Sequence, residues 1–145
     1  MKNLIIIAAA ALLSTNVTFA QDLSPADVPS VVMSSFNKSF PKSSSVEWEL
    51  KGDNYNAEFD LNRRDHEVWI SKNGAIVKHK KELKPSEIPA TVSTAIKRSY
   101  DGFRIDDVDR YEVNKQFYYK MELKKLNEER NVVFDQKGAE STIVL

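Results

Sequence analysis

The stretch Tyr55–Val77, YNAEFDLNRRDHEVWISKNGAIV, decides the fold of this chain. Its first seven residues alternate between apolar and polar side chains, the period of two that is typical of a half-buried β-strand. A charged loop follows, then a second strand around Val68 and Ile70, and then Asn73-Gly74, the dipeptide most typical of a tight hairpin turn. The stretch therefore predicts three antiparallel strands, the third beginning near Ala75.

A helix and a further strand are predicted before this stretch. Ser24-Pro25-Ala26-Asp27 has the features of a helix start: a serine cap, a proline in the first turn and an acidic residue near the positive end of the helix dipole. Apolar residues then recur every three to four positions from Val28 to Phe40, the spacing of one buried helix face. Pro41 ends the helix, and the alternating run Val46–Lys51 predicts a strand.

The same pattern begins again at Leu83. Leu23–Ser30 aligns with Leu83–Ala90, 60 residues later, and Phe59-Asp60-Leu61 aligns with Met121-Glu122-Leu123, 62 residues later. The second half is predicted to contain a helix from about 86 to 100 and strands near 107–113, 117–123, 131–135 and 141–145. The sequence therefore predicts an α+β fold: a tandem repeat of a helix plus a four-stranded antiparallel sheet, with the helices packed on one face of the sheet.

The first twenty residues have the features of a secretory signal peptide. Lys2 supplies a positive charge, Leu4–Leu13 is a short apolar run, and Thr18-Phe19-Ala20 places small residues before a cleavage site after Ala20. The apolar run is shorter than the roughly 20 residues that a membrane-spanning helix needs. We therefore expect a signal peptide at 1–20, one repeat at 21–82 and another at 83–145. The mature protein is expected to be periplasmic or secreted, with no membrane insertion after cleavage.

Charge balance and residue composition exclude several classes of binding partner and of catalytic site. The chain has 21 basic and 21 acidic residues, a formal net charge of zero at pH 7, and no cysteine. A balanced charge provides no electrostatic footprint for nucleic acid. The sequence contains no cysteine–histidine combination, no Gly-x-Ser-x-Gly motif and no glycine-rich phosphate loop. We therefore predict that the protein is not an enzyme and uses no cofactor.

Two histidines and one acidic run are the remaining candidates for ion binding. His66 stands in a charged turn and His79 among lysines, so we interpret both as exposed. The run Asp106-Asp107-Val108-Asp109 offers carboxylates that would suit calcium, but it lacks the acid spacing and the central glycine of an EF-hand loop. A charged connector is the preferred interpretation, with calcium as the alternative, and no metal site is predicted.

Two motifs, YNAEFDL…VWISKNGAIV and FYYKMEL…NVVFDQKGAES, stand one in each half of the chain. Together they resemble the PepSY-like family, a beta-lactamase-inhibitor-like group of small exported proteins common in Bacteroidota. In that family an aromatic-x-apolar-x-apolar strand precedes an apolar-x-apolar-Asp-x-x-Gly hairpin. Val132–Gly138 matches the hairpin, and Val68–Gly74 matches it with Ser71 in place of the aspartate. Over essentially the whole mature chain, the resemblance implies two helix-plus-sheet repeats side by side, a curved open sheet, and a binding or inhibitory role.

The sheet face away from the helices is the predicted binding surface. Aromatic side chains on an otherwise polar surface are frequent anchors of protein recognition, which points to Trp69 and Tyr118. The alternative for both is packing against the aliphatic parts of lysine and arginine side chains. The predicted partner-binding residues are Trp69, Tyr118, Glu47, Glu49, Glu58, Glu67, Arg110 and Lys120.

These features favour an exported, non-enzymatic module that binds a protein or peptide through its open sheet face, acting as an inhibitor of a protein or peptidase. Two alternatives stay open. The first is a passive envelope protein whose sheet face meets a second copy, forming a homodimer. The second is a carrier of a small ligand or of calcium.

Overall fold

The computed structural model describes residues 21–145, so the signal peptide predicted at 1–20 lies outside the described residues. Eight strands form one sheet in which each strand pairs antiparallel with the next along the chain. The strands are β1 (Gln21–Leu23), β2 (Ser44–Lys51), β3 (Asn54–Asp60), β4 (Asp65–Ser71), β5 (Ile76–Glu82), β6 (Arg104–Val113), β7 (Gln116–Lys125) and β8 (Glu128–Asp135). The helices are the 3-10 helices η1 (Pro25–Asp27) and η2 (Pro85–Glu87) and the α-helices α1 (Ser30–Ser39) and α2 (Ala90–Ser99). The predicted α+β class is confirmed.

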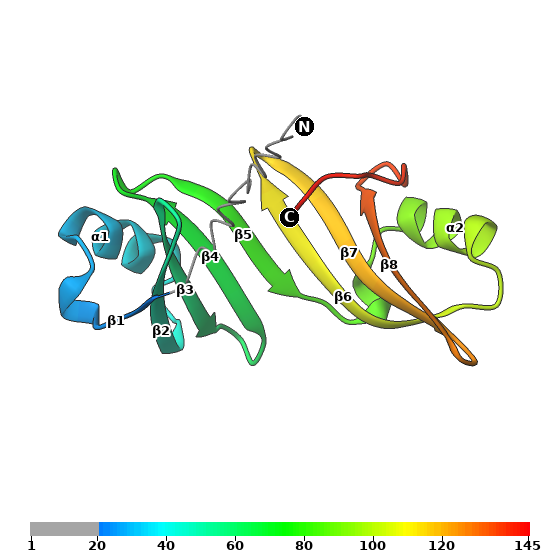
Figure 1. Ribbon diagram of the computed structural model, residues 1–145, viewed down its shortest axis with the longest axis horizontal. Coiled ribbons are helices and arrows are strands. Elements are labelled where there is room, and N and C mark those ends of the chain that lie inside the picture. Colours follow the sequence, from blue (N-terminus) through cyan, green and yellow to red (C-terminus); the bar gives the residue numbers. More distant parts are fainter. Residues whose placement is uncertain (1–20) are drawn as a thin grey trace, which may run out of the picture.

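Both α-helices pack on the same face of the sheet. Val68 of β4 is buried in the core that α1 covers, and its cross-strand neighbour on β5 is His79. His79 lies opposite Glu112 of β6, and Glu112 lies opposite Phe117 of β7, which packs against the core that α2 covers. Residues directly opposite each other in an antiparallel pair project to the same face. Figure 1 shows α1 and α2 at opposite ends of the molecule, with β5 between them.

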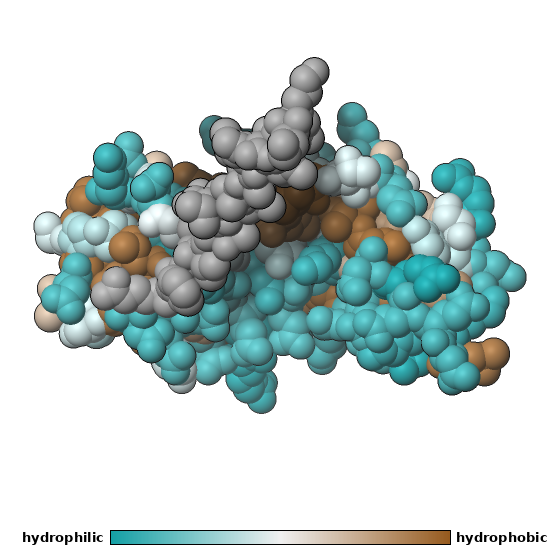
Figure 2. Space-filling model, in the orientation of Figure 1, coloured by the Kyte–Doolittle hydropathy of each residue, from teal (hydrophilic) through white to brown (hydrophobic). Residues whose placement is uncertain are grey.

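The buried apolar side chains form two separate clusters. Val32 and Phe36 of α1 belong to the first, and Val92 and Ile96 of α2 belong to the second. Between the clusters lies β5, with the sequence IVKHKKE, and none of its residues is buried. The helix face is therefore covered at its two ends and lacks a helix in the middle. In the view of Figure 2, hydrophilic residues cover most of the lower half of the visible surface.

Both α-helices begin later than the capping motifs predicted. In each half a single 3-10 turn comes first, and the chain is then extended at Val28 and at Ile88. These residues precede Pro29 and Pro89, and a proline ring disfavours the helical conformation in the residue before it. Each α-helix therefore starts only after its second proline.

The strand predicted at 141–145 is wrong. The segment after β8 is attached by a bridge between Phe134 and Glu140 and by a hydrogen bond from the Ser141 N–H to the Val133 carbonyl oxygen (2.8 Å). At the opposite edge, the short and unpredicted β1 pairs with β2. The eight strands are thus divided into five before α2 and three after it, which differs from the predicted four and four.

Each α-helix is approached by a turn that contains a glycine with positive φ. At Gly74 (φ +84°) a Cβ atom would lie 3.1 Å from the Val31 carbonyl oxygen of α1. At Gly138 (φ +81°) it would lie 2.6 Å from the Thr91 carbonyl oxygen of α2. A side chain at either position would adopt an unfavourable backbone conformation. At Gly138 it would also overlap the Thr91 carbonyl group, whereas at Gly74 it would make a tight contact with Val31. Glycine therefore lets each hairpin contact its helix.

We predict that Gly138→Ala destabilises the protein more than Gly52→Ala does. Both glycines have positive φ, but a Cβ at position 52 would have no neighbour within 4 Å. The free energy of unfolding should fall by about 1 kcal/mol for Gly52→Ala and by about 3 kcal/mol for Gly138→Ala, where backbone strain and overlap add. Urea denaturation followed by circular dichroism measures both. Equal losses would show that the contact between the hairpin and α2 does not contribute to the free energy of unfolding.

Candidate binding face

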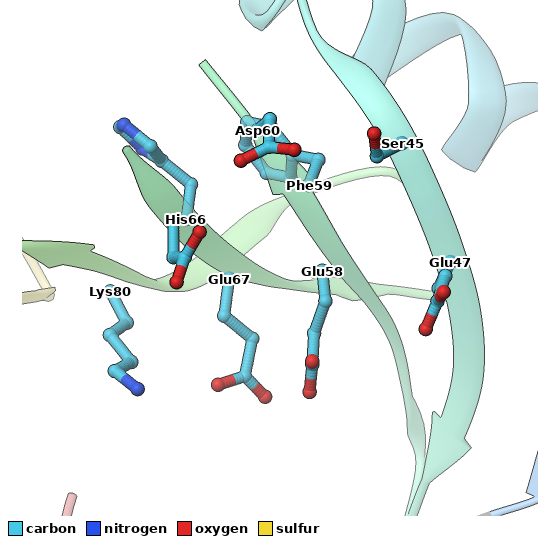
Figure 3. A pocket seen from close by; sticks show the side chains of 9 residues that line it. Ser45, Glu47, Glu58, Phe59, Asp60, His66, Glu67 and Lys80 are labelled. Atoms are coloured by element: carbon cyan, nitrogen blue, oxygen red, sulfur yellow. The ribbon is translucent and has the colours of Figure 1, made fainter. Parts of the chain in front are cut away.

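The sheet face opposite the two α-helices is called here the open face. The cross-strand register aligns one row of side chains on it from β2 to β8: Glu47, Glu58, Glu67, Lys80, Tyr111, Tyr118 and Asp135. In Figure 3 the side chains of Glu47, Glu58, Glu67 and Lys80 point to the same side of the sheet, whereas His66 points the other way. The row therefore runs across both halves of the molecule.

Seven of the eight predicted binding residues lie on the open face: Glu47, Glu49, Glu58, Glu67, Trp69, Tyr118 and Lys120. Arg110 does not, and its predicted placement is wrong. It lies opposite Tyr119, which is buried in the core that α2 covers, and its guanidinium is 5.0 Å from the centre of the Phe117 ring. Polarity is a poor mark of the open face here. Val108 of β6 is buried in the core that α2 covers, but no buried cluster includes Arg110, so a charged side chain can occupy the helix face at that position.

Tyr111 occupies the open-face position that was assigned to Arg110. It lies directly opposite Tyr118, forming an aromatic pair that the sequence analysis missed. Tyr111 is buried, and burial raises the pKa of its phenol. Tyr118 is half-buried and donates a hydrogen bond to Gln116 Oε1 (2.8 Å). The signal was present, since Tyr111 follows the apolar Val108 by three positions and so must face away from the core that holds Val108.

A lysine joins three carboxylates on the first half of the open face. Lys51 Nζ lies 2.9 Å from Glu49, 3.0 Å from Glu67 and 3.4 Å from Glu58. Although burial alone would lower the pKa of Lys51, the carboxylates of Glu49 and Glu67 raise it overall. The neighbouring Asn56 is 0% exposed and donates from Nδ2 to Glu67 Oε1 (3.0 Å). Its Oδ1 has no hydrogen-bond partner among the described residues.

Trp69 is partly covered by the chain itself. Lys78 Nζ lies 3.7 Å from the centre of the indole ring, a cation–π contact between neighbouring strands. Burial lowers the pKa of Lys78. This contact corresponds to the alternative considered for Trp69, packing against lysine. The indole is still half-buried rather than buried, and its contact with a partner stays a prediction.

His66 and His79 are not exposed, contrary to the prediction. His66 is 7% exposed, and its Nδ1 lies 2.9 Å from His79 Nε2, with the ring centres 5.2 Å apart. Phe59 stacks on His66, and Phe40, at the end of α1, packs on His79. The hairpin register, which pairs Phe59 with His66, could have located the first ring. No local signal relates His79 to Phe40, which lies far away in the sequence.

The histidine pair is neutral near pH 7. Burial lowers the pKa of both imidazoles from 6.5 to about 4, and the charges of Lys81 and Arg110 act in the same direction. For His66, Arg64 also lowers the pKa and Asp65 opposes it. In a neutral pair, one ring donates the hydrogen bond and the other accepts it. The surrounding cations disfavour the binding of a metal ion at this pair.

The acidic run proposed as a calcium alternative does not converge. Asp106 pairs with Arg104 and with Lys124 Nζ (2.6 Å), and these hydrogen bonds, that of Lys124 above all, lower its pKa. Asp109 instead lies 3.3 Å from Lys80 Nζ on the neighbouring β5. Among residues 21–145, no group of three or more His, Cys, Asp or Glu side chains is arranged to hold a metal ion.

We predict that the free energy of unfolding falls as the pH is lowered from 6.5 towards 4. The folded protein holds both imidazoles at a pKa below that of the unfolded chain, so folding favours the neutral rings. This contribution is complete above pH 6.5 and is lost as the unfolded chain takes up protons. Because the two rings are hydrogen-bonded to each other and titrate together, the loss between pH 7 and pH 5 should be about 1–2 kcal/mol for the pair.

The control for this pH dependence is His66→Gln/His79→Gln. Urea denaturation at pH 7 and at pH 5 should show a smaller difference for this variant than for the wild type. Carboxylates titrate mainly below this interval, so they contribute little to it. The same pH dependence in both proteins would contradict the assignment to the histidines.

Comparison with known proteins agrees with this architecture. The family model described as "Putative beta-lactamase-inhibitor-like, PepSY-like" matches residues 16–78 and 53–139. The fold is similar to that of a DUF2874 family protein from Bacteroides uniformis ATCC 8492, with 23% identity over 77% of this chain and 85% of that chain and a TM-score of 0.70. Among the curated proteins, no relative matches this chain.

Two further solved structures have the same fold. One is described as "putative periplasmic proteins" from Bacteroides eggerthii DSM 20697, with 24% identity over 78% of this chain and 85% of that chain and a TM-score of 0.70. The other is a BLIP-like protein from Bacteroides fragilis NCTC 9343, with 23% identity over 78% of this chain and 82% of that chain and a TM-score of 0.67. In residues 21–145, no helix is long and apolar enough to cross a membrane. The family model matches more than half of the chain, which confirms the resemblance seen in the sequence, and the protein belongs to the PepSY-like, beta-lactamase-inhibitor-like family.

Proposed function

We propose that this protein is an exported, non-enzymatic module that binds a protein or peptide partner through its open face and acts as an inhibitor-like binder. The observation that supports the proposal most is the open face itself, one side of an eight-stranded sheet whose two α-helices both lie on the other side. Half-buried Trp69 and Tyr118 stand on it among charged side chains. Large amphipathic side chains in such surroundings are frequent anchors of protein recognition.

The rigidity of the face supports the same function. Cross-strand hydrogen bonds hold every strand from β2 to β7 on both sides, so the backbone beneath the side chains is ordered before a partner arrives. Pre-organisation reduces the entropy that binding must overcome. The inhibitor-like part of the proposal rests on the family description and on the similarity to a BLIP-like protein.

We place the protein in the periplasm or outside the cell, with the signal peptide removed after Ala20. The charged, apolar and small-residue segments of 1–20 support this location. The protein of similar fold from Bacteroides eggerthii is described by the words "putative periplasmic proteins", which supports the same location.

We also propose that the two halves arose by duplication of one unit. Each has a 3-10 turn, two prolines and a ten-residue α-helix, in the same order. The contact of Gly74 with Val31 in the first half has its counterpart in that of Gly138 with Thr91 in the second. The unequal numbers of strands would then reflect later divergence at the two edges of the sheet.

We predict that Trp69→Ala/Tyr118→Ala abolishes capture of the partner. The wild type, this variant and the control Lys97→Ala/Arg98→Ala, which changes two exposed residues of α2, would serve as baits on the envelope fraction of the source organism. A specific partner should be retained equally by the wild type and the control. The amount of partner retained should fall by about tenfold or more with the open-face variant, because the loss of two anchor side chains weakens the affinity at least about tenfold. Circular dichroism confirms that each bait is folded, and an identical catch from all three would contradict the proposal.

The self-association alternative is tested on the same proteins. If the partner is a second copy, sedimentation should show a size that increases with concentration for the wild type and the control but not for the open-face variant. A carrier of calcium would show a higher melting temperature at millimolar calcium. We expect no such increase, because the carboxylates of Asp106 and Asp109 are paired with different lysines.

A further inference from the structure

Strands β2, β3 and β4 place carboxylates directly opposite one another on the open face. In one row Glu58 lies between Glu47 and Glu67, and in the next row Asp60 lies opposite Asp65. These five residues are called here the acidic rows. Like charges directly opposite in a sheet destabilise it, so folding alone does not explain this arrangement.

The chain itself neutralises the acidic rows only in part. Lys51 contacts Glu58 and Glu67 from one side. Glu47, Asp60 and Asp65 form no ion pair with another described residue. Three neighbouring strands thus present carboxylates that lack an intramolecular cation.

The second half of the open face is built differently. There Asp109 lies 3.3 Å from Lys80 on one side and directly opposite Lys120 on the other. Lys124 pairs with Glu122 on its own strand. Opposite charges on neighbouring strands are the arrangement that stabilises a sheet. Asp107 and Glu122 also lie directly opposite each other in this half, but Glu122 has Lys124 as its cation. The first half differs because Glu47, Asp60 and Asp65 have no intramolecular cation among the described residues.

The acidic rows surround a depression of about 350 Å³, whose lining includes all five of their residues. Figure 3 shows Glu47, Glu58 and Glu67 side by side along it. A concave surface lined by charges of one sign concentrates the electrostatic potential and attracts groups of the opposite sign. Lys80, at one end of the depression, is already engaged with Asp109.

An independent observation comes from Asn56, which is hydrogen-bonded to Glu67 of the acidic rows. The side chain is 0% exposed, and its Oδ1 accepts no hydrogen bond within the described residues. A buried acceptor without a donor is rare in folded proteins and unfavourable. Asn56 adjoins the acidic rows through Glu67 but is not part of the lining of the depression, so a ligand could donate to its Oδ1 only if the side chains that cover it move.

We propose that the segment of the partner that binds here is cationic, a lysine- or arginine-bearing peptide whose side chains lie along the acidic rows. The inference rests on the proposed function and specifies the chemistry of the partner. Guanidinium and ammonium groups form charge-assisted hydrogen bonds with carboxylates, and several of them along one peptide match carboxylates repeated on adjacent strands. A single metal ion fits less well, because in residues 21–145 no three acidic or histidine side chains are arranged around one point.

The test uses a fluorescently labelled ten-residue peptide of alternating arginine and glycine, with binding followed by anisotropy. The site variant is Glu47→Gln/Glu58→Gln/Asp65→Asn. The control, Asp27→Asn/Asp101→Asn/Glu129→Gln, removes the same charge from three exposed residues outside the acidic rows. Affinity should fall about tenfold in the site variant and less than about twofold in the control. The wild-type affinity should also weaken as salt is added. Equal losses in the two variants, or no binding of the peptide to the wild type, would overturn the proposal.

Stability separates a binding role from a structural one. Because neutralisation removes repulsion between opposite strands, the melting temperature of the site variant should equal or exceed that of the wild type. A marked decrease would show that the carboxylates serve the fold and would overturn the proposal.

Capture of a partner by the two variants distinguishes a failure of the cationic-segment proposal from a failure of the proposed function. A partner that is lost with Trp69→Ala/Tyr118→Ala but retained fully by the site variant would leave the proposed function standing and overturn the cationic segment. A partner whose retention is unaffected by any change on the open face would overturn both. Loss with both variants, and retention by both controls, is the result that we expect.

Discussion

The packing of two short α-helices against one face of a single sheet is the interaction on which the rest of the structure depends. Helices of ten residues are marginal by themselves. Each is about 15 Å long, and neighbouring strands are about 4.8 Å apart, so one helix covers at most about three strands, whatever its direction over the sheet. Two such helices cannot cover a sheet of eight strands. The centre of the helix face is left without a helix, and the opposite face has none at all.

The composition of the central strands follows from that geometry. Between the two cores, helix-face positions of β5 and β6 carry His79, Lys81 and Arg110, whereas Val108, elsewhere on β6, is buried in the core that α2 covers. The stacked histidines lie at the border of the first core, in contact with Phe40 and Phe59. Neutral rings that hydrogen-bond to each other can pack against aromatic side chains without the cost of burying a charge. The histidine pair therefore lies at the boundary between the apolar core and the charged strand β5.

Local periodicity predicted the features that neighbouring residues determine, such as the strands of Tyr55–Ser71 and the glycine turn that follows them. It failed where distant parts of the chain decide. The side of the sheet that Arg110 occupies depends on which strands the helices cover, and the three residues of β1 have too little pattern to be recognised. On the open face, the alternation that placed Glu47 and Trp69 correctly could not show which carboxylates would share Lys51, because that depends on the register between strands.

Few side chains of the open face pack in the two apolar cores. Folding therefore constrains their identity less than that of helix-face residues, and they are informative about function. On the helix face a charge near α1 or α2 would disrupt a core, and apolar side chains there report only on folding. On the open face the same sheet tolerates either charge. In the second half Asp109 lies between Lys80 and Lys120, whereas the first half sets Glu47, Glu58 and Glu67 side by side. The two halves share their helix packing and differ in the charge of the open face, so the fold constrains the helix face and leaves the charge of the open face free to vary.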